Sequence, residues 1–298
     1  MATPEPAHAP VPAPASDAVP GPPPSIAQAL AQARALGLDR VDAHALLGHL
    51  LGQGRSWLIA HDGDLLTAAQ AARFADWCRQ RADGVPVAYL LGEREFHGLR
   101  LQVTPDVLVP RPDTETLVDW ALDLLPALGA RPDVIDLGTG SGAIALAIAH
   151  RWPAATVSAT DLSPRALAVA RANADRLGLA VRWTEGPWWA AVAPGARFAL
   201  VLSNPPYIAG DDPHLAALRH EPRGALTPEG DGLQALRAIV AGAPDHLLPD
   251  GWLLLEHGYD QAEAVQALLR AAGFAEVATR QDLGGLPRCT GGRWPGPA

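Results

Sequence analysis

From about Asp113 onward, short apolar runs alternate regularly with longer segments of helical periodicity. The apolar runs predict strands at 134–137, 156–160, 181–184, 198–203, 252–256 and near 276–280. The segments between and around them predict helices at 114–125, 143–150, 164–177, 232–247 and 261–272. Strands that alternate with helices form a parallel sheet with helices on both faces. The expected fold class is therefore α/β, with a doubly wound, Rossmann-like sheet.

The chain before this alternation predicts three different segments. Residues 1–24, where proline, alanine and small residues dominate, cannot bury a core and are expected to form a disordered tail. Residues 25–84 predict a small bundle of three or four short helices, at 26–36, from Asp39 through Leu51, and from a cap at Thr67 to about Ala82. Residues 85–110 predict a β-hairpin linker with short strands at 87–91, 94–96 and 99–103.

Composition narrows the class of function. The net charge is −9, from 23 basic and 32 acidic residues, whereas proteins that bind nucleic acid usually carry a basic face. No apolar run approaches the length of a membrane span, and the N-terminus lacks the layout of a secretory signal. Cys78 and Cys289 have no metal-like spacing, so neither a disulfide framework nor a metal site is expected. These features favour a cytoplasmic protein without a membrane or a direct nucleic-acid partner.

The strand predicted at 134–137 runs into a glycine-rich turn that reads Asp136-Leu137-Gly138-Thr139-Gly140-Ser141-Gly142. Glycine permits positive φ and lets a ligand approach the backbone closely. Many α/β turns contain two glycines, but here the spacing departs from the G-x-G-x-x-G dinucleotide fingerprint and an acid ends the strand. S-adenosylmethionine carries an ammonium and a sulfonium but no phosphate, so a site for it requires a carboxylate. Asp136 is placed to meet its amino acid part directly or through water.

A second carboxylate, Asp161, stands at the end of the next predicted strand. This position suits an acid that accepts both ribose hydroxyl protons, as the equivalent acid does in dinucleotide folds. The structural alternative is a helix N-cap, but Ser163 followed by Pro164 fills that role better. Asp136, the glycine turn and Asp161 together predict a site for S-adenosylmethionine.

Directly after the strand predicted at 198–203 comes Asn204-Pro205-Pro206-Tyr207. The prolines fix φ and lack backbone N–H donors but keep their carbonyl oxygens. The segment is therefore rigid and rich in hydrogen-bond acceptors, at the carboxyl end of the sheet. An amide nitrogen is a poor nucleophile because its lone pair is delocalised. The Asn204 side-chain oxygen and the Pro205 carbonyl can hold its two N–H groups and stabilise the charge that develops there. Tyr207 can stack on the planar group and set its approach.

A proline-rich turn that merely ends a strand is the alternative for this motif. Because it lies downstream of the glycine turn, it instead predicts an amino-methyltransferase in which Asn204, Pro205 and Tyr207 take part in catalysis. No His, Glu or Cys stands beside the motif, so no general base is predicted.

On these motifs the chain resembles the protein-(glutamine-N5) methyltransferases that modify peptide-chain release factors, the HemK or PrmC group. The resemblance covers about 25–294. It also rests on segments 86–98, 109–115 and 254–258, and on Glu221-Pro222 with Ala225-Leu226. It implies a class I S-adenosylmethionine-dependent methyltransferase domain at 111–298. It further implies that the helices at 25–84 bind a class-1 release factor. The methylated residue would be the glutamine of a Gly-Gly-Gln tripeptide in that factor.

The resemblance also implies roles for single residues. The cofactor would be lined by Gly138, Thr139, Gly140, Ser141 and Gly142, with Asp161 on its ribose and Asn204 beside it, and the glutamine held by Asn204, Pro205, Pro206 and Tyr207. The family places a tryptophan against the cofactor. Trp188 fits that place best, whereas an ungapped alignment selects Trp189. Pro187 stands where the family commonly has an acid.

Three other functions compete with this interpretation. A DNA adenine-N6 methyltransferase uses a similar acceptor motif, but it requires base flipping and a basic groove, which the acidic balance disfavours. A glutamine methyltransferase of a large-subunit ribosomal protein would share the catalytic motifs and differ only in its N-terminal region. A cofactor-binding sensor without catalysis would not need the Asn-Pro-Pro-Tyr motif.

Overall fold

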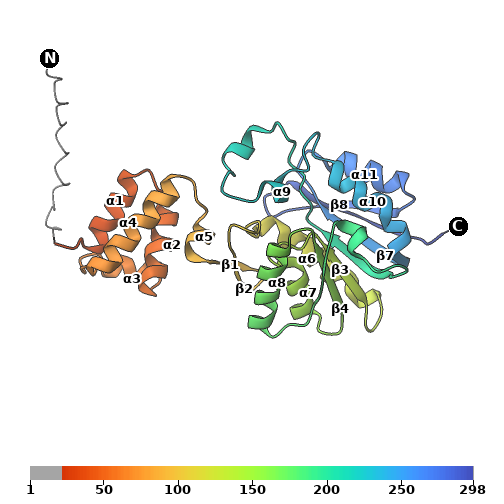
Figure 1. The fold of residues 1–298 in the computed structure, drawn as a ribbon, viewed down its shortest axis with the longest axis horizontal. Coiled ribbons are helices and arrows are strands. Elements are labelled where there is room, and N and C mark those ends of the chain that lie inside the picture. The colour runs from red at the N-terminus through yellow and green to blue at the C-terminus, as the bar shows by residue number, and fades with distance from the viewer. Residues whose placement is uncertain (1–21, 298) are drawn as a thin grey trace, which may run out of the picture. The chain divides into compact units, whose positions relative to one another are not determined.

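The structure is a computed structural model, and its description covers residues 22–297 (Figure 1). These residues form two compact units, which divide between Arg79 and Gln80. Residues 1–21 of the tail predicted at 1–24 lie outside the described range, and the Pro24 carbonyl accepts a hydrogen bond from the Leu66 amide at 3.0 Å. Across residues 22–297, no helix combines the length and apolar character needed to cross a membrane.

The first unit contains helices α1 (Ile26–Ala35), α2 (Arg40–Leu51), α3 (Arg55–Ala60) and most of α4 (Ala68–Ala82). Ser25 begins α1 with a reciprocal capping box to Gln28, and Asp39 caps α2 through the Val41 amide. The helices bury small and aliphatic side chains, together with Phe74 and Trp77. The sequence predicts α1, α2 and α4 close to their observed bounds.

The second unit begins with a helix where the sequence predicts a strand. Residues 87–91 form α5 (Val87–Leu91), and this strand prediction is wrong. Pro86 supplies a fixed φ of −56° before the first turn, and Gly92 ends the helix with a φ of 76°. The two strands that follow, β1 (Glu93–Phe96) and β2 (Leu99–Gln102), pair as the predicted antiparallel hairpin.

Within the described residues, the main sheet has seven strands in the order β5-β4-β3-β6-β7-β9-β8 (Figure 1). These are β3 (Asp133–Leu137), β4 (Thr156–Asp161), β5 (Arg182–Glu185), β6 (Phe198–Ser203), β7 (Leu247–Glu256), β8 (Ala275–Gln281) and β9 (Pro287–Arg293). The pairs from β5 through β7 are parallel, as predicted, whereas β9 runs antiparallel to both β7 and β8. The sheet is therefore mixed.

The sequence does not predict β9, because this strand contains two adjacent glycines, Gly291 and Gly292, and glycine is uncommon in strands. The structure shows why Gly291 stands there. A Cβ atom at this position would lie 2.3 Å from Leu254 Cδ2 and 2.9 Å from the Leu253 carbonyl oxygen. Close approach of β7, rather than backbone flexibility, requires the glycine.

Helices cover both faces of the sheet. Successive residues of β3 show this most directly, because Val134 packs into one buried cluster and Ile135 into the other. Helices α6 (Glu115–Leu124) and α7 (Ala143–Arg151) bury their apolar sides in the first cluster, which also includes Ala174 of α8 (Pro164–Leu177). Helices α10 (Gln234–His246) and α11 (Ala262–Ala271) form the second cluster on the opposite face. The doubly wound arrangement is confirmed.

The chain passes from β3 outward through β4 to β5 and then returns to β6 on the other side of β3. Such a reversal leaves a crevice at the carboxyl ends of the central strands, where open α/β sheets bind ligands. The glycine turn after β3, Asp161 at the end of β4 and Asn204 after β6 all lie at this edge.

Candidate active site

A cavity of about 320 Å³ lies at the carboxyl ends of β3, β4 and β6. The glycine turn contributes residues 138–141 to its wall, and the end of β4 contributes Asp161 with Leu162 and Ser163. Trp188, Asn204 and Pro206 line it as well. Eight of the residues predicted from sequence therefore meet around one cavity: Gly138, Thr139, Gly140, Ser141, Asp161, Trp188, Asn204 and Pro206.

The glycines of the turn serve different purposes. Gly138 has a φ of 76°, and a Cβ atom on it would lie 3.0 Å from the Trp188 ring, so its lack of a side chain makes room for the tryptophan. Gly142 begins α7 with a φ of 85°, and its missing Cβ would meet Leu146 at 3.0 Å and Ala170 at 3.2 Å. Gly142 thus faces packed protein and is absent from the cavity wall.

Asp136 lies beneath the turn rather than in the cavity wall. It is fully buried, and its Oδ2 accepts a 2.6 Å hydrogen bond from the Thr139 hydroxyl. Its Oδ1 has no hydrogen-bond partner among residues 22–297. Burial raises the pKa of Asp136 to about 7, against the lowering effect of the Thr139 hydrogen bond. A buried carboxylate with one open oxygen is suited to a cationic partner.

Asp161 lies in the cavity wall and also holds the turn together. Its Oδ2 accepts the Gly140 amide at 2.8 Å, and its Oδ1 accepts the Ser163 amide at 2.8 Å. Burial raises the pKa of this carboxyl, and the backbone hydrogen bonds oppose the shift. Ser163 in turn caps α8 through the Ala166 amide, with Pro164 in the first turn, as predicted.

The structure separates the two adjacent tryptophans. Trp188 opens the short 3-10 helix η3 (Trp188–Ala191) with a φ of 43° and lines the cavity. Trp189 points elsewhere: its Nε1 donates to the Ile239 carbonyl at 2.9 Å, and its ring stacks on His246 at 4.6 Å. Of the two, only Trp188 lies where a ligand of the cavity would contact it.

Asn204 lies at the cavity wall, and its side-chain amide has a fixed partner. Its Nδ2 donates to the Thr114 hydroxyl oxygen at 3.1 Å. The preceding residue, Ser203, donates from Oγ to the Leu137 carbonyl at 2.6 Å and so ties the end of β6 to β3. Pro205 is buried and does not line the cavity, whereas Pro206 does.

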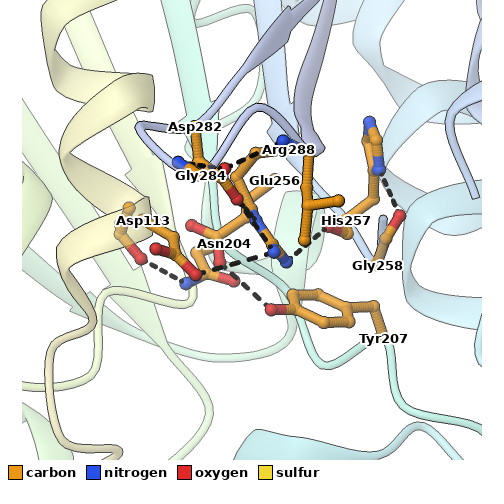
Figure 2. A network of polar contacts seen from close by, with 11 residues as sticks. Asp113, Asn204, Tyr207, Glu256, His257, Gly258, Asp282, Gly284 and Arg288 are labelled. Atoms are coloured by element: carbon orange, nitrogen blue, oxygen red, sulfur yellow. Dashed lines mark hydrogen bonds and ion pairs between the residues drawn. The ribbon is translucent and has the colours of Figure 1, made fainter. Parts of the chain in front are cut away.

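Tyr207 is also absent from the cavity wall. Its hydroxyl donates to Glu256 Oε1 at 3.2 Å (Figure 2). Its backbone carbonyl accepts a hydrogen bond from Gln261 Nε2 at 2.9 Å. Burial, together with the nearby Glu256 carboxylate, raises the pKa of the phenol well above its usual range. In this arrangement Tyr207 is a neutral hydrogen-bond donor behind the motif, and the stacking role expected from sequence stays a prediction.

Two parts of the cavity wall have no role assigned from sequence reasoning. One is residues 106–114 before α6, and the other is the stretch 222–225, most of which belongs to the short helix α9 (Arg223–Leu226). A 2.5 Å ion pair between Arg111 Nη2 and the buried Glu221 Oε1 joins them, and Glu221 Oε2 accepts the Val109 amide at 3.1 Å. Both segments carry the family resemblance, which is the signal that could have found them.

A buried polar network lies behind the Asn204 motif (Figure 2). Glu256, at the end of β7, is 1% exposed. Arg288 of β9 donates to Asp282 Oδ2 at 3.1 Å and lies 3.6 Å from Asp113 Oδ2. Its Nη1 also donates to the His257 carbonyl at 3.4 Å. The missed strand β9 therefore supplies the cation of this network.

Comparisons with known proteins agree with this geometry. Residues 25–92 match the family model of the PrmC N-terminal domain, and residues 117–281 match that of the methyltransferase small domain. A release factor glutamine methyltransferase from Bordetella pertussis is 55% identical over 258 residues, covering 86% of this chain and 95% of that protein. One from Burkholderia pseudomallei is 54% identical over 281 residues, covering 92% and 98%. The chain belongs to the release factor glutamine methyltransferase family.

A crystal structure of a methyltransferase from Pyrococcus furiosus superimposes with a TM-score of 0.50 at 19% identity, over 78% of this chain and 100% of that one. At this identity it supports the fold alone.

Enzymes of this family use S-adenosylmethionine, and the residues around the cavity fit it. The cofactor combines an ammonium, a sulfonium, a ribose and an adenine. The cavity wall contains a carboxylate (Asp161) and the ring of Trp188, and a second carboxylate with an open oxygen (Asp136) is buried beneath the glycine turn. When bound, the cofactor supplies an electrophilic methyl group.

Proposed function

We propose that this enzyme transfers a methyl group from S-adenosylmethionine to class-1 peptide-chain release factors. The acceptor is the side-chain amide nitrogen of the glutamine in their Gly-Gly-Gln motif, and the modification supports translation termination. One observation carries the chemistry of the proposal. Asn204 borders the cavity with its Nδ2 engaged by Thr114, which leaves its Oδ1 as a fixed acceptor beside the glycine turn. The names of the relatives support the choice of substrate.

In this proposal, residues 138–141, Asp161 and Trp188 bind the cofactor, and Asp136 compensates its positive charge from below the turn. Gly142 supports the turn through packing. Asn204 Oδ1 and the Pro205 carbonyl hold the two N–H groups of the substrate amide, flanked by Pro206 and Tyr207. The positions of residues 138–141, Asp161, Trp188, Asn204 and Pro206 around one cavity support this proposal, whereas the roles of Pro205 and Tyr207, which do not line the cavity, rest on the motif alone.

The proposed chemistry depends on acceptors that are fixed before the reaction. As the new C–N bond forms, positive charge develops on the amide nitrogen and its N–H groups become stronger donors. Acceptors that do not need to reorient stabilise this charge more than they stabilise the neutral amide. The stiffness of Asn204-Pro205-Pro206 and the bond from Asn204 to Thr114 provide such acceptors.

We further assign recognition of the protein substrate to the helical segment 25–84 and the methyltransferase domain to 111–298, joined by 85–110. A release factor is a protein of the translation apparatus, so the proposal places the enzyme in the cytoplasm.

The decisive experiment supplies labelled S-adenosylmethionine and one purified acceptor at a time. We expect label on a release factor and none on a release factor whose Gly-Gly-Gln glutamine is replaced by alanine. Equal labelling of both would contradict the proposed target residue. Labelling of a large-subunit ribosomal protein or of adenine in DNA, with none on release factors, would replace the proposal with one of those alternatives.

A further inference from the structure

Helix α8 packs directly against the end of the glycine turn. A Cβ atom on Gly142 would lie 3.2 Å from Ala170 Cβ, and Asn173, three residues further on, lies on the same face of the helix. Asn173 is fully buried. A buried side-chain amide costs free energy unless its N–H groups and its oxygen find partners, so the partners of Asn173 indicate what it holds in place.

The Asn173 amide uses all of its hydrogen-bonding capacity. Its Nδ2 donates to the Ser141 carbonyl and to the Gln102 carbonyl, each at 3.0 Å. Its Oδ1 accepts from the Gln102 amide at 2.7 Å and from Arg176 Nη2 at 3.2 Å. A reversed amide would set its NH₂ group against two donors and its oxygen against two carbonyls. The four contacts therefore fix one orientation, with a donor toward the turn.

The peptide between Ser141 and Gly142 is held on both sides. Its carbonyl accepts from Asn173, and its N–H donates to the Thr139 carbonyl at 2.9 Å. Hydrogen bonds to the end of β4 secure the turn up to Gly140, and Asn173 secures the part that follows. Because Ser141 lines the cavity, the position of this part of the wall depends on the bond from α8.

The same amide also holds the strand that leads to another part of the wall. Asn173 exchanges two hydrogen bonds with the backbone of Gln102, as a neighbouring strand residue does in an antiparallel ladder. Gln102 ends β2, and the chain continues from there into residues 106–114, most of which line the cavity. One buried amide thus joins the glycine turn to the start of a second wall segment.

We propose that Asn173 is a positioning residue that sets the Ser141–Gly142 peptide for binding of S-adenosylmethionine before the cofactor arrives. The assignment rests on the proposed role of residues 138–141 in cofactor binding. Asn173 lies outside the cavity wall and acts through the turn. Its role requires a donor and an acceptor on one short side chain, which aspartate and leucine, of similar size, do not provide.

Two substitutions of Asn173 test this role. Asn173→Asp keeps both acceptor contacts but turns an oxygen toward the Ser141 and Gln102 carbonyls, whereas Asn173→Leu removes all four hydrogen bonds. We expect both to raise the dissociation constant of S-adenosylmethionine about tenfold or more, measured by calorimetry at a temperature where circular dichroism shows each variant folded. At saturating cofactor, kcat should fall by less than about threefold, because the lost interaction affects ground state and transition state alike.

Arg176→Met is the matched control. It removes the contact of Arg176 with Asn173 Oδ1 and its hydrogen bond to the Arg100 carbonyl, yet leaves the donor to Ser141 in place. We expect its cofactor dissociation constant to stay within about twofold of the wild type. An increase as large as that of Asn173→Leu would assign the effect to packing of α8 on β2 and overturn the proposal.

Hydrogen exchange of the Gly142 amide, read by NMR in the cofactor-free protein, tests the proposal without depending on a variant. In the wild type this amide should exchange about as slowly as that of Leu146, which donates to the Gly142 carbonyl at 2.8 Å in the first turn of α7. In the Asn173 variants it should exchange at least about tenfold faster, with Leu146 less affected. Rapid exchange of Gly142 in the wild type would overturn the proposal.

An unchanged cofactor dissociation constant in both Asn173 variants would also overturn the positioning role. These measurements follow cofactor binding and the turn itself, so their outcome does not depend on which acceptor is methylated. Failure of the wild type to label release factors would contradict the proposed function and would leave the result for Asn173 unaffected.

Discussion

At the scale of single residues, the site depends on acceptors held in place by neighbours outside the cavity. Asn204 is held by Thr114, Asp161 by the Gly140 and Ser163 amides, and Asp136 by the Thr139 hydroxyl. Such contacts fix the position of each group before a ligand arrives, which reduces the cost of ordering it on binding.

Replacing Asn204 by alanine should abolish methyl transfer while leaving cofactor binding nearly unchanged. The substitution removes one fixed acceptor of the developing charge, a loss worth about 10²- to 10³-fold in comparable sites. Single-turnover transfer of label to a release factor measures the rate, and calorimetry measures the cofactor dissociation constant. Unchanged turnover would contradict the role of Asn204.

Asp161→Ala should weaken cofactor binding by about tenfold or more, since it removes a cavity carboxylate and two hydrogen bonds that shape the turn. The same calorimetric titration measures the change in the cofactor dissociation constant. Ser158→Ala, on the same strand but nearer its amino end, is the control and should bind the cofactor as the wild type does.

Cofactor affinity should also rise with pH. Burial raises the pKa of Asp136 to about 7, and a bound cation favours its ionised form, so binding near pH 7 releases a proton. We expect the dissociation constant to fall between pH 6 and 8 and then to level off. Calorimetry in two buffers of different ionisation enthalpy would detect the proton. An Asp136→Asn variant with the same pH dependence would contradict this assignment.

At the scale of elements, the sequence predicts most helices and strands because their apolar periodicity and caps are local signals. Prediction fails where a short apolar run is ambiguous between helix and strand, and where tertiary contacts decide. Residues 87–91 form a helix set by Pro86 and Gly92, and β9 uses glycines because β7 approaches closely. The motif residues around the cavity could be predicted, whereas the hydrogen bond from Asn204 to Thr114 could not, because it joins two segments that lie far apart in the sequence.

Gly291→Ala should therefore destabilise the second unit. The added methyl would lie 2.3 Å from Leu254 Cδ2 and 2.9 Å from the Leu253 carbonyl, so β7 or β9 must shift, at a cost of roughly 1–3 kcal/mol. Thermal or denaturant unfolding measures the loss. Gly224→Ala, where a Cβ atom would meet nothing within 4 Å, is the control. Equal stability of the two variants would show that the strands adjust freely.

At the scale of the whole molecule, the buried carboxyl of Glu256 makes the stability of the fold depend on pH. Burial raises the pKa of Glu256 in the folded protein to about 7, from the usual 4.5 of a glutamate. Its contribution to stability is thus fully present below about pH 4.5 and is lost as the pH rises through about 7. The Asp113 carboxylate raises this pKa, whereas the Arg288 guanidinium and the hydrogen bond from the Tyr207 hydroxyl lower it.

Glu256→Gln should consequently be more stable than the wild type at pH 8, by an amount on the order of 3 kcal/mol, and the advantage should vanish near pH 4.5. Denaturant midpoints at the two pH values measure it. A stability difference that does not change with pH would contradict the buried ionisation.

The position of β9 in the sheet determines the order in which the last strands can pair during synthesis. This strand is the last in sequence, yet it lies between β7 and β8 and is the only neighbour of β8 within the described sheet. Residues 275–281 can therefore join the sheet only after 287–293 have left the ribosome. Arg288 arrives with the same strand, so the charge beside Glu256 is balanced only once residues 287–293 have joined the sheet.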